Sequence, residues 1–156
     1  MKPQKHNENV VLPAFDAEGN LPPGIHDASW KEINERFGTN LQRRSQLSGM
    51  WRAIENLSKA GCRTFFIDGS FVTSKLYPND YDCLWEADEA NLQLVDPILK
   101  DFTSKGRAAQ KVKYSGEFFP VLAIEGSSRN PFLEFFQHDK ETGMRKGLVR
   151  VRVSSA

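Results

Sequence analysis

Two short apolar segments near the middle of the chain, residues 62–69 and 80–87, constrain the fold more than any other part of the sequence. They read CRTFFIDG and DYDCLWEA, and the first is rich in aromatic and β-branched residues, which favours a strand. Gly69 ends the first segment, and Asn79 follows Pro78 directly before the second. We therefore predict two neighbouring strands joined by a loop, with at most one helical turn between them.

Two helices are predicted before these strands. Asp27 and Ser29 each offer a start, and Glu32 lies three residues after Ser29 as in a capping box, so a short helix is expected to run to Gly38. A second helix is expected from about residue 40 to residue 60, because its apolar residues recur at spacings of three and four. That apolar set consists of Leu47, Met50, Trp51, Ile54 and Leu57.

The second half of the chain is predicted to contain one more helix and several strands. The helix is expected over residues 88–106, kinked or divided by Pro97. Four strands are expected over residues 108–114, 117–125, 131–137 and 147–153. Residues 138–147 have the composition of a hairpin-like connection. This order of elements predicts an α+β fold with a mixed β-sheet packed by helices.

Length, charge and cysteine content limit the class of protein. A chain of 156 residues suits one domain, which we place at residues 25–156, preceded by a polar tail or arm at residues 1–24. The net charge of +1 excludes a global field that would recruit nucleic acid or anionic membrane, and no membrane association is expected. Cys62 and Cys83 are expected to be buried free thiols, and a cytoplasmic location is expected.

Asp80 and Asp82, at the start of the second predicted strand, are the first candidates for chemistry. Carboxylates two residues apart on a strand face the same side, and they repel each other unless a cation or water lies beside them. Gly69 and Ser70 end the first predicted strand, and a glycine and a hydroxyl there suit a phosphate group. Paired aspartates offer the hard oxygen ligands that suit Mg²⁺. Together these residues predict a phosphoryl- or nucleotidyl-transfer site.

A strand ending in Gly-Ser, a short loop and then Asp-x-Asp on a second strand resembles the nucleotidyltransferase superfamily related to DNA polymerase β. The resemblance extends mainly over residues 62–114 and is closest to the small bacterial and phage-borne members, including the minimal nucleotidyltransferases that act as antitoxins. It implies a nucleotidyltransferase-like sheet and binding of an NTP, with ATP as the expected nucleotide. It also implies that Gly69 and Ser70 bind the phosphates, and that Asp80 and Asp82 hold two Mg²⁺ ions.

The resemblance further implies a third carboxylate on a later strand. The candidates are Glu117, Glu125 and Glu134. Glu117 is preferred because it starts a strand expected to lie near the aspartates. Glu134 comes second, because an unpaired carboxylate among apolar residues would be costly. On this interpretation Asp80, Asp82 and Glu117 are both the catalytic residues and the metal ligands.

The loop departs from the pattern of the minimal members, which carry Arg-Gly within it and Ser before the first Asp. Here Thr73 and Ser74 lie near the Arg-Gly position, Asn79 precedes Asp80, and the loop is about one residue shorter. Lys75 is the candidate to replace the lost arginine charge on the triphosphate, as a point charge rather than a bidentate fork.

The expected function is therefore a Mg²⁺-dependent transferase that moves an NMP from an NTP to a protein or RNA hydroxyl, in an antitoxin or phage-defence setting. A toxin-like partner protein, an RNA end or a second copy of the chain would complete the site. The first alternative is a catalytically idle module of the same fold that binds a partner protein, which the missing Arg-Gly favours. The second is a nucleic-acid-binding accessory protein that uses its basic C-terminal strand, which the near-zero net charge opposes.

Overall fold

The structure is a computed structural model that describes residues 11–154. Its sheet contains the strands β1 (Gly24–Asp27), β2 (Thr64–Asp68), β3 (Asp82–Trp85), β4 (Glu117–Pro120) and β5 (Gly147–Arg152). They lie in the order β1-β5-β2-β3-β4. The pairs β1/β5 and β3/β4 are parallel, whereas β5/β2 and β2/β3 are antiparallel. The predicted α+β class with a mixed sheet is confirmed.

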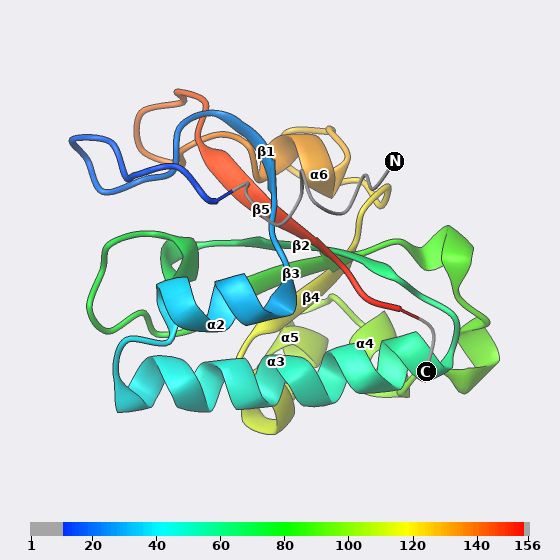
Figure 1. The fold of residues 1–156 in the computed structure, drawn as a ribbon. Helices are drawn as coiled ribbons and strands as arrows, with labels where there is room; N and C mark the ends of the chain where they lie inside the picture. The colour runs from blue at the N-terminus through cyan, green and yellow to red at the C-terminus, as the bar shows by residue number, and fades with distance from the viewer. Residues whose placement is uncertain (1–10, 155–156) are drawn as a thin grey trace, which may run out of the picture.

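Helices cover both faces of this sheet (Figure 1). They are α2 (Trp30–Phe37), α3 (Leu41–Lys59), α4 (Pro97–Lys100), α5 (Ser104–Tyr114) and α6 (Phe132–Phe135). Figure 1 shows α3, α4 and α5 below the sheet and the single-turn helix α6 at the other side, beside β1 and β5. Three short 3₁₀ turns, η1 (Ser70–Val72), η2 (Ala87–Glu89) and η3 (Leu92–Leu94), complete the regular structure of the described residues.

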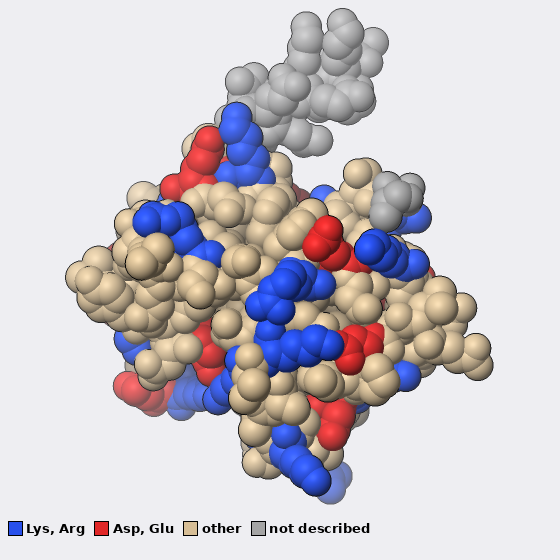
Figure 2. Space-filling model, turned by 90° about the horizontal axis from the view of Figure 1, so that it is seen from below, with Lys and Arg blue, Asp and Glu red and all other residues tan. Residues whose placement is uncertain are grey.

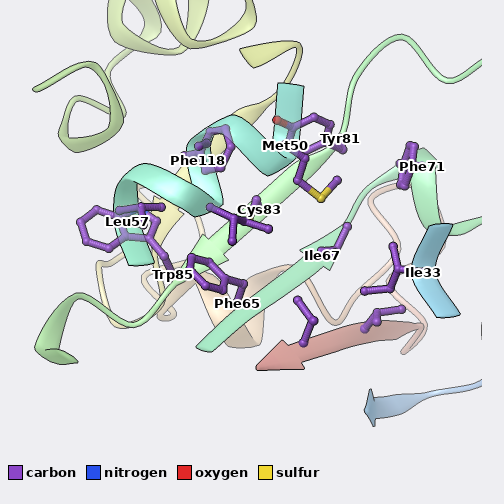
Figure 3. Close-up of a cluster of buried hydrophobic side chains, with 14 of the residues drawn as sticks. Ile33, Met50, Leu57, Phe65, Ile67, Phe71, Tyr81, Cys83, Trp85 and Phe118 are labelled. Carbon is purple, nitrogen blue, oxygen red and sulfur yellow. The ribbon is translucent and has the colours of Figure 1, made fainter. Parts of the chain in front are cut away.

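The two faces of the sheet bury different side chains. One face carries Phe65, Ile67, Cys83, Trp85 and Phe118, which form the main core together with α2 and α3. Figure 3 shows part of this cluster. The other face packs a smaller cluster of Phe66, Leu84, Phe119 and Leu148 against α6. Since side chains alternate along a strand, the next residues on this second face are Asp68 of β2, Asp82 of β3 and Glu117 of β4.

The first half of the chain follows the sequence predictions closely. Helix α2 is capped by Ser29, whose side chain accepts a hydrogen bond from the Glu32 N–H, and it ends at Gly38. The Glu32 carboxylate accepts from the Leu12 N–H, so only one half of the capping box forms. Helix α3 buries the predicted stripe apart from Trp51, which is half-buried with its ring centroid 5.0 Å from that of Trp30.

The predicted third helix over residues 88–106 is wrong. The segment is divided into η2, η3 and α4, and Pro97 begins α4 instead of kinking a longer helix. Side chains interrupt the helix: Asn91 accepts from the Gln93 N–H, and Asp96 accepts from the Ile98 N–H. Each of these local caps starts a new short turn, since Asn and Asp compete with the helix for backbone donors.

The predicted strand over residues 108–114 is also wrong, because those residues belong to α5. The buried residues of α5 are Gly106, Gln110 and Tyr114, four residues apart, which is a helical spacing. Gln110 is fully buried, donates to the carbonyls of Ile98 and Asp101, and accepts from the Phe118 N–H. Because Gln110, at the centre of the buried stripe, is polar, the spacing of apolar residues alone does not predict a helix here.

The predicted strand over residues 131–137 is wrong as well. Phe132, Phe135 and Phe136 have the i, i+3, i+4 spacing of a helix, and residues 132–135 form α6. The strand predicted over residues 117–125 ends at Pro120 in β4. Residues 138–147 form the expected turn, with Gly143 at a φ of 72°, but they connect α6 to β5. The last predicted strand is confirmed as β5.

Part of the predicted tail packs on the domain. Leu12 and Leu21 are buried, and Arg36 of α2 donates to the carbonyls of Leu12 and Pro13. Residues 24–27 form the edge strand β1, which was not predicted. Residues 1–10 lie outside the described residues. Both cysteines are buried free thiols, as predicted. Among the described residues, no helix is long and apolar enough to span a membrane.

Candidate functional site

Three carboxylates form a row across three adjacent strands. Asp68 of β2 lies opposite Asp82 of β3 in the antiparallel register. Asp82 lies beside Glu117 of β4 in the parallel register. Residues opposite each other in a ladder project from the same face, so the three side chains share one side of the sheet. The sheet therefore brings together Asp82 and Glu117, two of the predicted ligands, and adds Asp68.

Asp80 joins this row through a lysine. The Lys111 Nζ atom lies 3.2 Å from Asp80 Oδ2 and 3.3 Å from Glu117 Oε2, so one ammonium bridges both carboxylates. Arg107 also contacts Glu117, with 3.5 Å between Nε and Oε2. Arg107 and Lys111 are four residues apart on α5 and therefore lie on the same face of that helix. The hydrogen bond to Asp80, followed by that to Glu117, raises the pKa of Lys111 above its usual value, which keeps the ammonium charged.

Asp68 is the most deeply buried member of the row. It is fully buried, and neither of its carboxylate oxygens has a hydrogen-bond partner among the described residues. The nearest cation is Lys146, whose Nζ atom lies 3.5 Å from Asp68 Oδ1. Burial raises the pKa of Asp68 to about 6, and the charge of Lys146 opposes that rise. Lys146 therefore favours the ionised form of Asp68, against the effect of burial.

Asp82 has no ion-pair partner among the described residues, although it lies at the centre of the row. Burial raises its pKa to about 8, and the neighbouring charges of Asp68, Asp80 and Glu117 add to the shift. The repulsion expected between paired aspartates is thus relieved at Asp80 by Lys111 and is unrelieved at Asp82. Lys140 lines both clefts with Asp82 and opposes the rise of its pKa, but among the described residues no cation lies within ion-pair distance of this carboxylate.

Gly69 and Ser70 lie directly beside Asp82. Gly69 adopts a φ of 87°, a conformation that side chains disfavour, and a Cβ atom there would lie 2.9 Å from Asp82 Oδ2. Both the backbone conformation and the close approach of the carboxylate therefore require glycine. Ser70 begins η1 and lines the same cleft as Asp80 and Asp82. The predicted neighbourhood of Gly69, Ser70 and the aspartates is present.

A buried arginine of α3 holds the loop between β2 and β3. The Arg43 guanidinium donates to the carbonyls of Phe37, Phe71, Thr73 and Lys75, at 2.7 Å for Phe71 and 2.9 Å for Thr73. The Lys75 side chain is exposed and does not line the cleft. The structure therefore does not bring Lys75 to the site. Sequence reasoning missed Arg43, because an arginine in an amphipathic helix is ordinarily exposed.

The two other candidates for the third carboxylate have different partners. Glu125 accepts hydrogen bonds from the Ser127 and Ser128 N–H groups within its own turn, which lowers its pKa to about 2. Glu134 pairs with Arg145, with 2.9 Å between Oε2 and Nη2. Glu117 is the only one of the three that lies in register with Asp82.

Two clefts meet at Asp82. The first, which we name the polar cleft, has a volume of about 420 Å³, and its lining includes Gly69, Ser70, Asp80 and Lys146. The second, the aromatic cleft, has a volume of about 470 Å³, and its lining includes Phe102, Phe119, Phe132, Arg107 and Glu117. Asp82, Phe135, Phe136 and Lys140 line both. Asp82 therefore lies at the boundary between a polar hollow and a mainly aromatic one.

The carboxylates suit a hard divalent cation in donor type and in charge. Oxygen ligands are those that Mg²⁺ prefers, and a cation beside Asp82 would favour its ionised form by lowering its raised pKa. Their present positions are not those of a formed metal centre: within residues 11–154, no group of three or more His, Cys, Asp or Glu side chains is arranged to hold a metal ion. At Asp80 and Glu117, the ammonium of Lys111 contacts the oxygen atoms that a metal would bind.

Sequence reasoning missed the cations of the site. Arg107 and Lys111 lie in or beside the segment predicted as a strand, so their shared helical face was not visible. Lys146 lies in residues 138–147, which were predicted only as a hairpin-like connection. A helix prediction for residues 104–114 would have placed Arg107 and Lys111 together, and Thr103, whose side chain caps Gly106 N–H, was the available signal.

Comparison with known proteins identifies a family but no activity. Residues 13–152 match the model of DUF6932, a family of unknown function, and the chain belongs to that family. No curated protein and no solved structure matches the chain. A function for the chain therefore depends on the chemistry of its own residues.

Proposed function

We propose that the chain is a Mg²⁺-dependent nucleotidyltransferase that moves an NMP, AMP from ATP as the first candidate, to a hydroxyl group. The observation that carries this proposal is the register of the sheet. It places Asp82 beside Glu117 and next to Gly69, at the point where the polar cleft opens. Hard oxygen donors beside a hollow lined by Ser70 and Lys146 suit a metal-bound polyphosphate.

Each group has a separate role in this proposal. Asp80, Asp82 and Glu117 would hold the metal. Bound Mg²⁺ would neutralise charge on the phosphates and lower the pKa of the attacking hydroxyl. Ser70 would donate to a phosphate oxygen, and Lys146 would add positive charge at the same cleft. The aromatic cleft would offer apolar surface to the substrate on the Glu117 side of the row.

A protein hydroxyl is the first candidate acceptor, ahead of the 3′ end of an RNA. RNA binding requires a field of unpaired basic residues. The C-terminal basic residues have acidic partners: Arg145 pairs with Glu134, and Arg150 and Arg152 pair with Asp27. On the face seen from below in Figure 2, basic and acidic side chains are interspersed. A toxin-like partner protein, or a second copy of the chain, would supply the acceptor.

Calorimetric titration with ATP, with and without Mg²⁺, tests the proposal. We expect Mg²⁺-dependent binding with a Kd below about 1 mM. Asp80→Asn and Asp82→Asn should each weaken it by at least about tenfold. Asp88→Asn, at an exposed carboxylate beyond the other end of β3, is the matched control and should bind as the native chain does.

Transfer is the second step of the same test. Native chain incubated with α-labelled ATP and candidate protein acceptors should release pyrophosphate and leave label on a hydroxyl, and Asp82→Asn should abolish both. If the native chain binds no ATP at millimolar concentration in the presence of Mg²⁺, the isolated chain is not the proposed enzyme.

One observation favours a second candidate function, a catalytically idle module that binds a partner protein. Lys111 already neutralises Asp80 and Glu117, as it would in a site that never receives a metal. On this alternative, neither ATP nor Mg²⁺ raises the melting temperature of the chain. A partner protein would bind with equal affinity to the native chain and to Asp80→Asn.

A further inference from the structure

Lys111 occupies the space between two of the proposed metal ligands. Its Nζ atom lies 3.2 Å from Asp80 Oδ2 and 3.3 Å from Glu117 Oε2. A single ammonium at nearly equal distance from two carboxylates neutralises the charge that a divalent cation would neutralise. The two cations would therefore compete for the same oxygen atoms.

The Lys111 bridge can open without leaving its partners buried and unpaired. The Lys111 side chain is 49% exposed, so its ammonium can return to water at little cost. Glu117 keeps its contact with Arg107 when Lys111 leaves. Asp80, with a side chain that is 30% exposed, can be solvated or can bind another cation.

The other cations of the site leave Asp82 without a direct partner. Arg107 contacts Glu117 and Lys146 contacts Asp68, whereas Lys140 lines both clefts and, among the described residues, lies beyond ion-pair distance of Asp82. Asp68 already has Lys146 at 3.5 Å, so Asp82 is the member of the row that an added cation would approach. A cation that also bound the flanking oxygens of Asp80 and Glu117 would have to compete with Lys111 for them.

We propose that Lys111 is a displaceable internal counter-ion, so that a divalent cation binds between Asp80 and Glu117 only as the lysine ammonium leaves. This inference depends on the proposed metal site and adds that the chain itself limits metal affinity. Lys111 thereby prevents weakly binding free cations from occupying the oxygen atoms of Asp80 and Glu117. Only a cation that binds more strongly than the lysine ammonium replaces it. A metal that arrives already bound to a polyphosphate has additional contacts in the polar cleft, and it would displace the lysine more readily.

Metal affinity without nucleotide tests the inference. Mn²⁺ binding is measured by electron paramagnetic resonance of the free ion, and Mg²⁺ binding is measured by its competition with Mn²⁺. We expect Lys111→Gln and Lys111→Ala to bind Mn²⁺ about tenfold more tightly than the native chain, which corresponds to about 1.4 kcal/mol. Lys113→Gln is the matched control, since Lys113 lies on the same helix and pairs with Asp96 away from the row. Its affinity should be unchanged.

The outcomes separate this inference from the proposed function. If the native chain and both Lys111 variants bind Mn²⁺ equally, Lys111 does not compete with the metal, although the metal site itself stands. If none of them binds Mn²⁺, both the inference and the metal-dependent function are overturned. Equal gains in Lys111→Gln and Lys113→Gln would reveal a general charge effect and would also overturn the inference. Circular dichroism establishes that each variant is folded.

Discussion

Two lysine–carboxylate contacts lie on opposite sides of Asp82, and they differ in burial more than in distance. Lys146 lies 3.5 Å from Asp68, which is fully buried, and its own side chain is only 19% exposed. Lys111 lies 3.2 Å from Asp80, and its side chain is 49% exposed. Removing one partner of a buried pair leaves an uncompensated charge, whereas an exposed pair is replaced by water.

The Lys146–Asp68 and Lys111–Asp80 contacts have the same chemistry, but their different burial gives them different functions. The Asp68–Lys146 pair is fixed by burial and stabilises the end of β2. In the Asp80–Lys111–Glu117 bridge, the lysine can exchange with another cation, and until it does so it neutralises negative charge at both carboxylates. Asp82 lies between these two contacts and has no lysine or arginine within ion-pair distance among the described residues. An added cation would therefore lower the pKa of Asp82 most.

The largest expected effect comes from breaking the buried pair. Lys146→Met should lower the free energy of unfolding by about 3 kcal/mol near neutral pH, because Asp68 would remain buried without its cation. Urea unfolding measures this change. The loss should be smaller at about pH 5, where Asp68, whose pKa is raised to about 6, is largely protonated.

The double variant Asp68→Asn/Lys146→Met provides the control for this loss. It should be more stable than Lys146→Met alone, because no buried charge remains. A double variant as unstable as the single one would mean that Lys146 stabilises the fold through packing and that the ion pair is unimportant.

A smaller effect of the opposite sign is expected at Asp82. In chelator-containing buffer at about pH 8, Asp82→Asn should raise the free energy of unfolding by about 2 kcal/mol. The pKa of Asp82 is raised to about 8, so between its unfolded value and that pH the folded chain binds more protons than the unfolded chain. Stability therefore falls as the pH rises through this window, and the group costs nothing at lower pH.

The pH dependence distinguishes this cause from better packing. The gain in Asp82→Asn should fall below about 1 kcal/mol at about pH 4, where the folded carboxyl group is protonated and the unfolded one is about half protonated. A gain that is the same at both pH values would show that the charge of Asp82 is not the source of the instability.

The smallest expected effect is on the exposed bridge. Lys111→Gln should change the free energy of unfolding by less than about 1 kcal/mol, because exposed ion pairs contribute little. The same urea titrations measure it. A loss as large as that in Lys146→Met would remove the distinction between the two contacts, and Lys111 would then be a structural residue.

The elements that could be predicted from sequence are those whose pattern is local. Helix α3 has an apolar stripe at helical spacing, and β2 and β3 have short apolar runs bounded by Gly69 and Pro78. Helix α5 could not be recognised in this way, because Gln110 fills its buried stripe through hydrogen bonds to Ile98, Asp101 and Phe118. Its partners lie on other elements, so the reason for its burial is tertiary.

The residues of the candidate site also fall into two groups, those predicted from local sequence and those that only the fold brings together. Gly69, Ser70, Asp80 and Asp82 were found from their order along the chain, and the preference for Glu117 agrees with its register beside Asp82. The cations Lys111 and Lys146 come from α5 and from the segment before β5, distant in sequence. Only the folded arrangement shows that Lys111 bridges two carboxylates, because no spacing along the chain encodes a contact between separate elements.

A crystal structure of the chain with Mn²⁺ and a non-hydrolysable ATP analogue tests the central claim most directly, since anomalous scattering locates the metal. We predict Mn²⁺ coordinated by Asp80 and Asp82, with Glu117 as a further ligand, the triphosphate in the polar cleft beside Ser70, and Lys111 withdrawn from both carboxylates. Crystals that bind neither Mn²⁺ nor nucleotide at the row, with Lys111 still bridging Asp80 and Glu117, would contradict it.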